Sequence, residues 1–386
     1  MADEPKLSAT ISLPTNFRIE EVVARSPIPG PHPPGPAPAP PPDLGPLAAF
    51  TGNWHGNGFN TIFRPNNTVT PTPLPQPVGG DNILELNLTS ETLSFSSSLG
   101  SVPNRGMVQG DIFLNGVPYL QAINDITIAG KPVGIHLEPG LWVIVPATTH
   151  PAEGVTLARM ASIPHGTTVL AQGTSTVIAG PPKIPAVDIT PFPTGQPGNK
   201  IHFPSQTAAT EGTARIPQDL HPFIVTGTIT QAMLTDPNSV LRDHIAGQTI
   251  TSTTAISIST SPAVPLFGGG AENIAFLLGQ PKPNARTTQM TATFWIETVE
   301  HKIVLPPHFV VGQPLDVKPQ AVHASLPLPT FSITPPHGIV PGHTITIKSR
   351  QIQYTQTVML EFNGLTWPHV SVATLVPAGA IPIGWP

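Results

Sequence analysis

The chain contains no cysteine among its 386 residues. This absence excludes disulfides, thiolate nucleophiles, cysteine-based zinc sites and thiolate ligation of haem. Charged residues are also scarce, at 10% of the chain, compared with roughly 25% in ordinary globular proteins. The 17 basic and 22 acidic residues include no basic cluster along a strand or helix face. The sequence therefore predicts no nucleic-acid binding.

Long apolar runs are missing as well. No uninterrupted run approaches the roughly 20 residues that a membrane helix needs, and the opening MADEPKLSAT lacks the basic-then-apolar pattern of a signal peptide. We therefore expect no membrane span and a cytoplasmic location. The low charge has two explanations, a turn-rich β surface of Ser, Thr and Asn, or a surface covered by a partner or by long loops. The second, together with the Pro-rich arms, predicts a homo-oligomer.

The motifs of several enzyme classes are absent too. The sequence has no His-Glu-x-x-His zinc motif, no Gly-x-Ser-x-Gly nucleophile elbow and no phosphate-binding glycine loop after a strand. The acidic residues are scattered and form no recognisable pair of the kind that glycosidases use. These absences count against hydrolase, kinase and metalloprotease functions.

Proline and glycine are abundant, with 52 and 34 residues respectively. Because proline lacks a backbone donor and breaks helices, this content argues against a helical protein. Runs of alternating Val, Ile, Thr and Phe lie between turn dipeptides such as Asn-Gly and Pro-Gly, which is typical of antiparallel strands. We expect strands in the first half at residues 54–63, 82–88, 107–114, 119–128, 141–146, 155–163 and 167–172. In the second half we expect them at residues 223–234, 248–260, 273–278, 288–299, 302–305, 343–347, 351–362 and 370–376.

The two halves of the chain echo each other weakly. The first-half segment FTGNWHGNGFNTIFRPNN can be laid over IVTGTITQAMLTDPNS in the second half, and a Pro-His-Gly occurs in each half. This pattern suggests a duplicated barrel. We predict an all-β fold of two antiparallel barrels in tandem. Residues 1–44 would form a Pro-rich arm, 45–175 a first barrel with the ligand site, 176–214 a connector and 215–386 a second barrel.

The segment 50–65, FTGNWHGNGFNTIFRP, carries the most specific pattern in the chain. Trp54 is large enough to plug the closed end of a barrel, and residues 43–50 before it are expected to form a short capping helix. Gly56 and Gly58 would relieve crowding where a strand coils sharply or a ligand comes close. The alternative is an ordinary glycine-rich strand with a tryptophan in the core.

Gly52, Trp54, Gly56 and Gly58 resemble the Gly-x-Trp-x-Gly-x-Gly opening of the nitrobindin group of calycin barrels, relatives of lipocalins and fatty-acid-binding proteins. The resemblance covers about 15 residues of motif and about 130 residues of general strand order. It implies calycin-like barrels and a pocket for haem b held by one axial histidine. Nitrobindin-like proteins are usually single barrels of less than half this length, and the axial histidine cannot be matched by position.

Histidine is the candidate ligand type, because the chain has 14 of them and no cysteine. His150 and His165 lie in the final hairpin expected for the first barrel, with Arg159 between them. His165 lies between Pro164 and Gly166, at an expected turn. It is a candidate iron ligand or a structural histidine. Arg64 could pair with a propionate at the barrel mouth or lie on the surface. His369 is the counterpart candidate in the second half.

Three functions follow from these features. The first is a haem-binding barrel, with His165 on the metal, His150, Arg159, Trp54, Gly56, Gly58 and Arg64 around the cofactor, and peroxidase-like chemistry. The second is a lipocalin-like carrier of an apolar small molecule, which needs no catalytic residue. The third is a structural or assembly subunit.

Overall fold

The computed structural model describes residues 43–279, 284–306, 308, 310–338 and 342–385. The expected Pro-rich arm 1–44 lies almost wholly outside these residues. None of the helices in the described ranges is long and apolar enough to cross a membrane.

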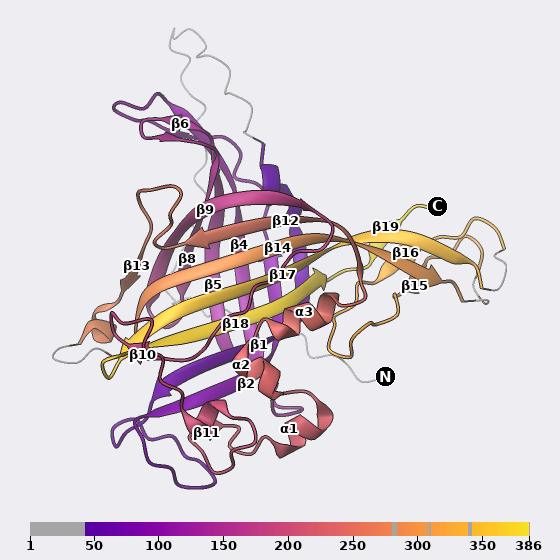
Figure 1. Ribbon diagram of the computed structural model, residues 1–386. Coiled ribbons are helices and arrows are strands. Elements are labelled where there is room, and N and C mark those ends of the chain that lie inside the picture. Colours follow the sequence, from indigo (N-terminus) through magenta and orange to yellow (C-terminus); the bar gives the residue numbers. More distant parts are fainter. Residues whose placement is uncertain (1–42, 280–283, 307, 309, 339–341, 386) are drawn as a thin grey trace, which may run out of the picture. The chain divides into compact units, whose positions relative to one another are not determined.

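Ten strands of the described chain close into one antiparallel barrel, shown in Figure 1. Their order around the barrel is β2, β1, β18, β17, β14, β12, β9, β8, β5 and β4, and β4 pairs with β2 to complete the ring. These strands are β1 (Gly52–Pro65), β2 (Asn82–Phe95), β4 (Ile112–Asp125), β5 (Val133–Val145), β8 (Thr156–Ile163), β9 (Thr167–Ala179), β12 (Thr249–Ser259), β14 (Arg286–Val304), β17 (Thr344–Phe362) and β18 (Leu365–Pro377).

Short elements connect and cover the barrel. The short strands are β3 (Val102–Asn104), β6 (Thr148–Thr149), β7 (Ala152–Glu153), β10 (Phe192–Pro193), β11 (Arg215–Ile216), β13 (Gly270–Asn273), β15 (Leu315–Val317), β16 (Phe331–Ile333) and β19 (Ile381–Ile383). The helical elements are η1 (Gly45–Ala49), η2 (Pro204–Gln206), α1 (His221–Thr226), α2 (Gln231–Thr235), α3 (Ser239–Ile245) and η3 (Ala275–Leu278).

The all-β class and the barrel are confirmed, but the division into two tandem barrels is not. The six strands from the first half leave β1 and β9 as open edges. Four strands from the second half bridge these edges, with β18 against β1 and β12 against β9. An unpaired edge exposes backbone donors and acceptors, and closing the ring satisfies them. The segment that echoes the opening strand, residues 224–239, forms the end of α1, all of α2 and the start of α3, so the weak repeat does not mark a second barrel.

Several of the expected strands take another form. Residues 223–234 contain the ends of α1 and α2 instead of a strand. Pro222 occupies the first turn of α1, Gly227 ends it in the left-handed conformation, and the Thr230 hydroxyl accepts a hydrogen bond from the backbone of α2. These capping residues override the β propensity of the segment. Residues 275–278 form η3, and β4 begins only at residue 112.

Phe50 and η1 close one end of the barrel, as the expected capping helix predicted. The Phe50 ring stacks on Phe95 with 5.1 Å between ring centroids, and it lies 5.4 Å from the ring of Trp142. The indole Nε1 of Trp54 donates to the carbonyl of Phe50 at 2.8 Å. Trp54 is therefore buried at the plugged end, as the sequence predicted.

The connector between β9 and β12 covers the outer face of β1, β2 and β18. Its strand β10 pairs with β18, and β11 runs parallel to β2. Phe203 from this segment lies 6.0 Å from the Phe63 ring and stacks at 5.5 Å on Trp367. Apolar side chains on both faces of these strands are therefore buried, which fits the explanation that the chain's own loops cover part of its surface.

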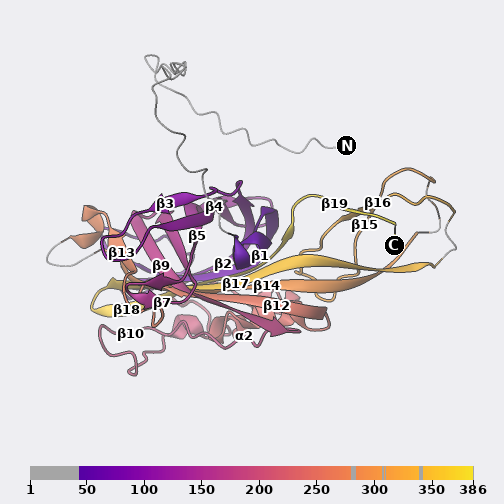
Figure 2. The same cartoon turned by 90° about the horizontal axis from the view of Figure 1, so that it is seen from above.

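A second, smaller core lies on the far ends of β14 and β17, which extend beyond the barrel in Figure 2. The three-stranded sheet of β15, β16 and β19 packs there. Phe331 and Ile333 of β16 are fully buried against Ile303 and Ile345. This core is separate from the barrel interior.

Candidate functional site

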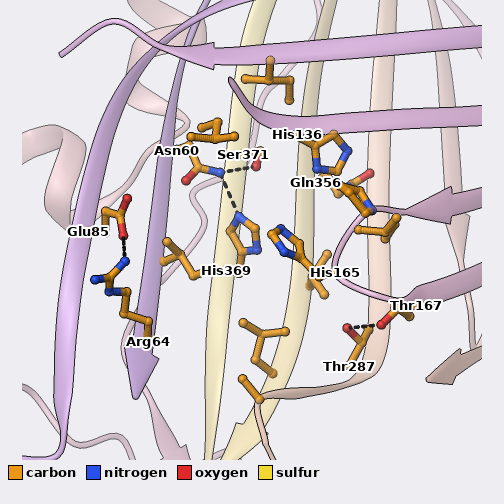
Figure 3. A pocket seen from close by; sticks show the side chains of 18 of the residues that line it. Asn60, Arg64, Glu85, His136, His165, Thr167, Thr287, Gln356, His369 and Ser371 are labelled. Carbon is orange, nitrogen blue, oxygen red and sulfur yellow. Dashed lines mark hydrogen bonds and ion pairs between the residues drawn. The ribbon is translucent and has the colours of Figure 1, made fainter. Parts of the chain in front are cut away.

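The open end of the barrel contains a cavity of about 740 Å³ (Figure 3). Its volume lies within the range of small-molecule pockets. Its apolar lining consists of Ile62, Ile123, Ile135, Ile163, Pro164, Ile274, Phe276, Leu277, Ala285, Val358 and Leu360, together with Gly134. Its polar lining consists of Asn60, Arg64, Glu85, Asn87, Gln121, His136, His165, Thr167, Thr287, Tyr354, Gln356, His369 and Ser371.

A buried ion pair lies against this cavity. Glu138 on β5 accepts short hydrogen bonds from the guanidinium of Arg159 on β8 and from the Tyr119 hydroxyl. Burial opposes ionisation of Glu138, but the positive charge of Arg159 and the hydrogen bond from His136 outweigh it and lower the pKa to about 2. Arg159 also donates to the cavity-lining Gln356 at 2.7 Å. The pair stays charged, and its two charges compensate each other.

A second buried carboxyl, that of Glu91 on β2, contacts two residues of the cavity lining. The Tyr354 hydroxyl donates to its Oε2 at 2.6 Å, and Gln121 Nε2 lies 3.3 Å from the same oxygen. Burial raises the pKa of Glu91 to about 6, although hydrogen bonds from Tyr354, Thr89 and Gln121 act against the rise. Tyr354 and Gln121 carry this network to the cavity wall.

Three histidines line the cavity from separate strands or turns. His136 on β5 lies 3.1 Å from Glu138 through its Nε2 atom. His369 on β18 lies 2.8 Å from the Asn60 side-chain nitrogen, which also donates to Ser371 at 2.7 Å. Burial lowers the pKa of His369 to about 3, with smaller contributions from His136 and His165, so its imidazole is neutral at physiological pH.

His165 sits at the cavity rim, in the tight turn between β8 and β9. Gly166 follows it with a φ of 92°, a backbone conformation that favours glycine. Partial desolvation, and to a smaller degree His136, lower the pKa of the His165 ring. Among the residues that the structure describes, no side chain or backbone group forms a hydrogen bond with this ring. The lowered pKa favours the neutral form of the ring, which faces the cavity in Figure 3.

Arg64 also lies at the rim, at the end of β1. It donates to Glu85 Oε2 at 3.2 Å and to the Thr72 hydroxyl at 2.9 Å. Arg64 and Glu85 both line the cavity. Arg64 is therefore already paired in the structure.

The comparisons with known proteins assign no family. No family model matches the chain. No curated protein matches it either. A solved structure, the crystal structure of Rv2717c from M. tuberculosis, aligns with a TM-score of 0.33 and 9% identity, over 87% of this chain and 97% of that one. A likeness of this degree assigns neither a family nor a function, so the nitrobindin resemblance stays a prediction.

The sequence-predicted residues divide into two groups. His165 and Arg64 line the cavity, and Arg159 lies directly behind its wall through Gln356. His150 lies at the exposed turn between β6 and β7, where its backbone N–H donates to Gln109 at 3.0 Å, and it does not line the cavity.

The glycines of the opening motif serve strand packing. A Cβ atom added to Gly56 would lie 2.0 Å from the Thr374 carbonyl oxygen, and one added to Gly58 would lie 2.1 Å from that of Val372. Neither glycine, nor Trp54, lines the cavity. The close approach is made by the backbone of β18, and the motif marks where the barrel closes.

No group of three or more His, Cys, Asp or Glu side chains in the described ranges is arranged to hold a metal ion. The cavity histidines are separately engaged, since His136 contacts Glu138 and His369 contacts Asn60. A haem iron that is held by a single histidine does not require such a group of three side chains. His165 is the cavity histidine whose ring is not already hydrogen-bonded within the described chain.

Sequence reasoning missed His136, Glu138 and Glu91, and it treated the acidic residues as unpaired. One signal was available for the first two. Residues two apart on a strand share a face, so His136 and Glu138 had to point the same way as the barrel-filling Trp142. Their partner Arg159 is on another strand, and only the strand order brings it to Glu138.

Proposed function

We propose that the barrel is a binding protein for a small, largely apolar molecule held in the cavity at its open end. The observation that carries this proposal is the cavity itself, with a volume of about 740 Å³ and walls of isoleucine, leucine and valine side chains. A few convergent polar groups at its inner end would orient the ligand. That combination is typical of small-molecule sites.

The plugged end of the barrel supports a binding role. The rings of Phe50, Phe95 and Trp142 pack together at one end, and in the described chain the cavity lies on the side of His165 and Arg64. The exposed apolar side chains of Ile274 and Phe276 lie at that mouth. They would cover an apolar ligand once it is inside.

Titration with Nile red, a neutral apolar dye, tests the proposal through its fluorescence. Gly134 lines the mouth, and a Cβ atom there would meet its nearest neighbour at 3.6 Å, an ordinary contact. Gly134→Trp should therefore obstruct the cavity, fold normally and lower dye affinity by at least tenfold. Gly110→Trp, on an open loop away from the cavity, is the matched control and should bind like the parent. Equal binding by both variants would contradict the proposal.

His165 supports haem b as a specific ligand. Its neutral ring faces the apolar cavity and has no hydrogen-bond partner in the described chain, which fits ligation by a single imidazole. Arg64 at the rim would hold a propionate, in addition to its bond to Glu85. When bound, haem would supply the redox chemistry of a peroxidase-like activity. His136, hydrogen-bonded to Glu138, would hold or move a proton beside it.

Addition of haemin to the full-length chain tests this ligand. The proposal predicts a Soret band that His165→Ala shifts or abolishes. His150→Ala changes a histidine that lies away from the cavity, so this control should leave the band unchanged. No Soret change with any form of the protein would reject haem and leave the apolar-ligand proposal standing.

A further inference from the structure

The side-chain amide of Asn60 determines which nitrogen of His369 carries the proton. Asn60 Nδ2 contacts His369 Nε2 at 2.8 Å and the Ser371 hydroxyl at 2.7 Å. Its Oδ1 accepts from Asn87 Nδ2 at 3.3 Å. Because an amide nitrogen can only donate, His369 Nε2 must accept, and the proton of the neutral ring lies on Nδ1.

The Nδ1–H of His369 is then a donor without a protein acceptor in the described residues. It belongs to a ring that lines the cavity beside His165, as Figure 3 shows. A donor that faces the cavity and lacks a protein partner favours a ligand that can supply an acceptor. The ring stays neutral because it is largely desolvated, so it offers a directed hydrogen bond and no positive charge.

The charges around the cavity disfavour an anionic group beside His369. Arg159 is paired with Glu138, and Arg64 is paired with Glu85. A carboxylate that entered would find no unpaired cation among the described lining residues, and it would lose its hydration. An uncharged acceptor such as a carbonyl group needs no cation as a partner, and it does not lose the hydration of a charge.

We propose that the cavity selects an uncharged apolar molecule with a carbonyl group, whose oxygen accepts a hydrogen bond from His369 Nδ1–H, and that Asn60 is the positioning residue that fixes this donor. This inference rests on the proposed binding function and names an uncharged ligand class as the alternative to haem b, whose propionates are anionic. The chemistry is that of a ketone or aldehyde on an alkyl chain or ring.

Asn60→Asp exchanges the donor and acceptor nitrogens of His369 without removing the hydrogen bonds among Asn60, Asn87, His369 and Ser371. A carboxylate at this position would accept from Ser371, from Asn87 and from His369 Nε2–H, so all three neighbours keep a hydrogen bond. The proton of His369 then moves to Nε2, and its Nδ1 becomes an acceptor. Asn53→Asp adds the same charge at an exposed position of the same strand and serves as the matched control.

Displacement of Nile red by undecanone, undecane, undecanol and undecanoate gives the affinities. The parent protein and Asn53→Asp should bind undecanone about tenfold more tightly than undecane, the size of one hydrogen bond, and undecanoate more weakly than undecanone. In Asn60→Asp the advantage of undecanone over undecane should disappear. Undecanol should keep its affinity, since a hydroxyl can donate as well as accept.

Nitrogen NMR of His369 provides a second readout that needs no ligand. The proposal predicts the Nδ1–H tautomer in the parent protein and the Nε2–H tautomer in Asn60→Asp. An Nε2–H tautomer in the parent, or equal affinities for undecanone and undecane, would overturn the inference and leave the binding function intact. If none of the four compounds binds and Nile red does not bind either, both proposals fail together.

Discussion

Gly56 is the residue whose requirement is most directly visible. Its α-carbon faces the Thr374 carbonyl of β18 so closely that a methyl group would lie 2.0 Å from the oxygen. The contact atom belongs to the backbone of a central strand and cannot move aside. The glycines that suggested a ligand pocket from the sequence are thus explained by closure of the barrel between its first and last long strands.

We expect Gly56→Ala to destabilise the protein by about 1 to 3 kcal/mol or more, the usual cost of overpacking. Urea unfolding followed by tryptophan fluorescence measures this change. Gly110→Ala places the same methyl group in open space and should leave the unfolding midpoint unchanged. An unchanged midpoint for Gly56→Ala would show that β1 and β18 are further apart than in the structure.

Glu297 gives a residue-scale prediction for pH dependence. It is fully buried on β14, where Oε2 accepts from Gln351 at 2.6 Å and Oε1 has no partner in the described part of the chain. Burial raises its pKa from 4.5 to about 8, partly opposed by the Gln351 hydrogen bond. Between these values the folded state binds a proton that the unfolded state does not, so stability falls as pH rises.

Glu297→Gln removes this titration. The stability of the variant relative to the parent should therefore increase as the pH rises from 5 to 8, by up to about 1.4 kcal/mol per pH unit. Unfolding curves at several pH values measure the difference. A difference that stays constant across this range would show that Glu297 has an ordinary pKa in the folded protein.

At the scale of elements, Arg215 organises the connector. Its guanidinium is fully buried and donates to six backbone carbonyls, those of Ser205, Thr207, Ala208, Thr210, Pro217 and Gln218. Burial lowers its pKa to about 10. A segment that the sequence presents as a Pro-, Gly- and Thr-rich connector is thereby held in one conformation against β2.

Arg215→Lys should destabilise this region by about 2 to 4 kcal/mol, because one ammonium group with three donors cannot satisfy six carbonyls. Hydrogen exchange of residues 204–218, together with thermal unfolding, measures the effect. Arg105→Lys changes an exposed arginine and serves as the control. Unchanged exchange in the connector of Arg215→Lys would contradict this role.

The sequence predicted features that depend on local chemistry. It missed those that depend on contacts between residues far apart in the sequence. Trp54, which the sequence predicted to plug the barrel, is buried at its closed end. Residues 223–234 alternate like a strand, but Pro222, Gly227 and Thr230 cap two helices there. His136, Glu138 and Arg159 meet only through the register of β5 and β8, which no local pattern encodes.

At the scale of the whole molecule, the barrel depends on both halves of the chain. The structure pairs β1 with β18 and β9 with β12, so residues 45–175 alone would have two open edges. A homo-oligomer stays a prediction at this scale. So does the role of the Pro-rich arm.

We therefore expect a fragment of residues 45–175 to lack cooperative unfolding, because the four strands that close the ring are missing. Circular dichroism during urea titration, with the full-length chain as reference, tests this expectation. A fragment that unfolds in one sharp transition and binds Nile red would instead support the tandem arrangement.

The most direct test of the central claim is methyl NMR of the full-length chain with isoleucines labelled, recorded with and without Nile red. Ile62, Ile123 and Ile163 line the cavity, whereas Ile303, Ile345 and Ile347 belong to the second core. Binding in the cavity predicts shifts at the first three methyl groups, none at the last three, and their loss in Gly134→Trp. Shifts confined to the second core, or none at saturating dye, would contradict it.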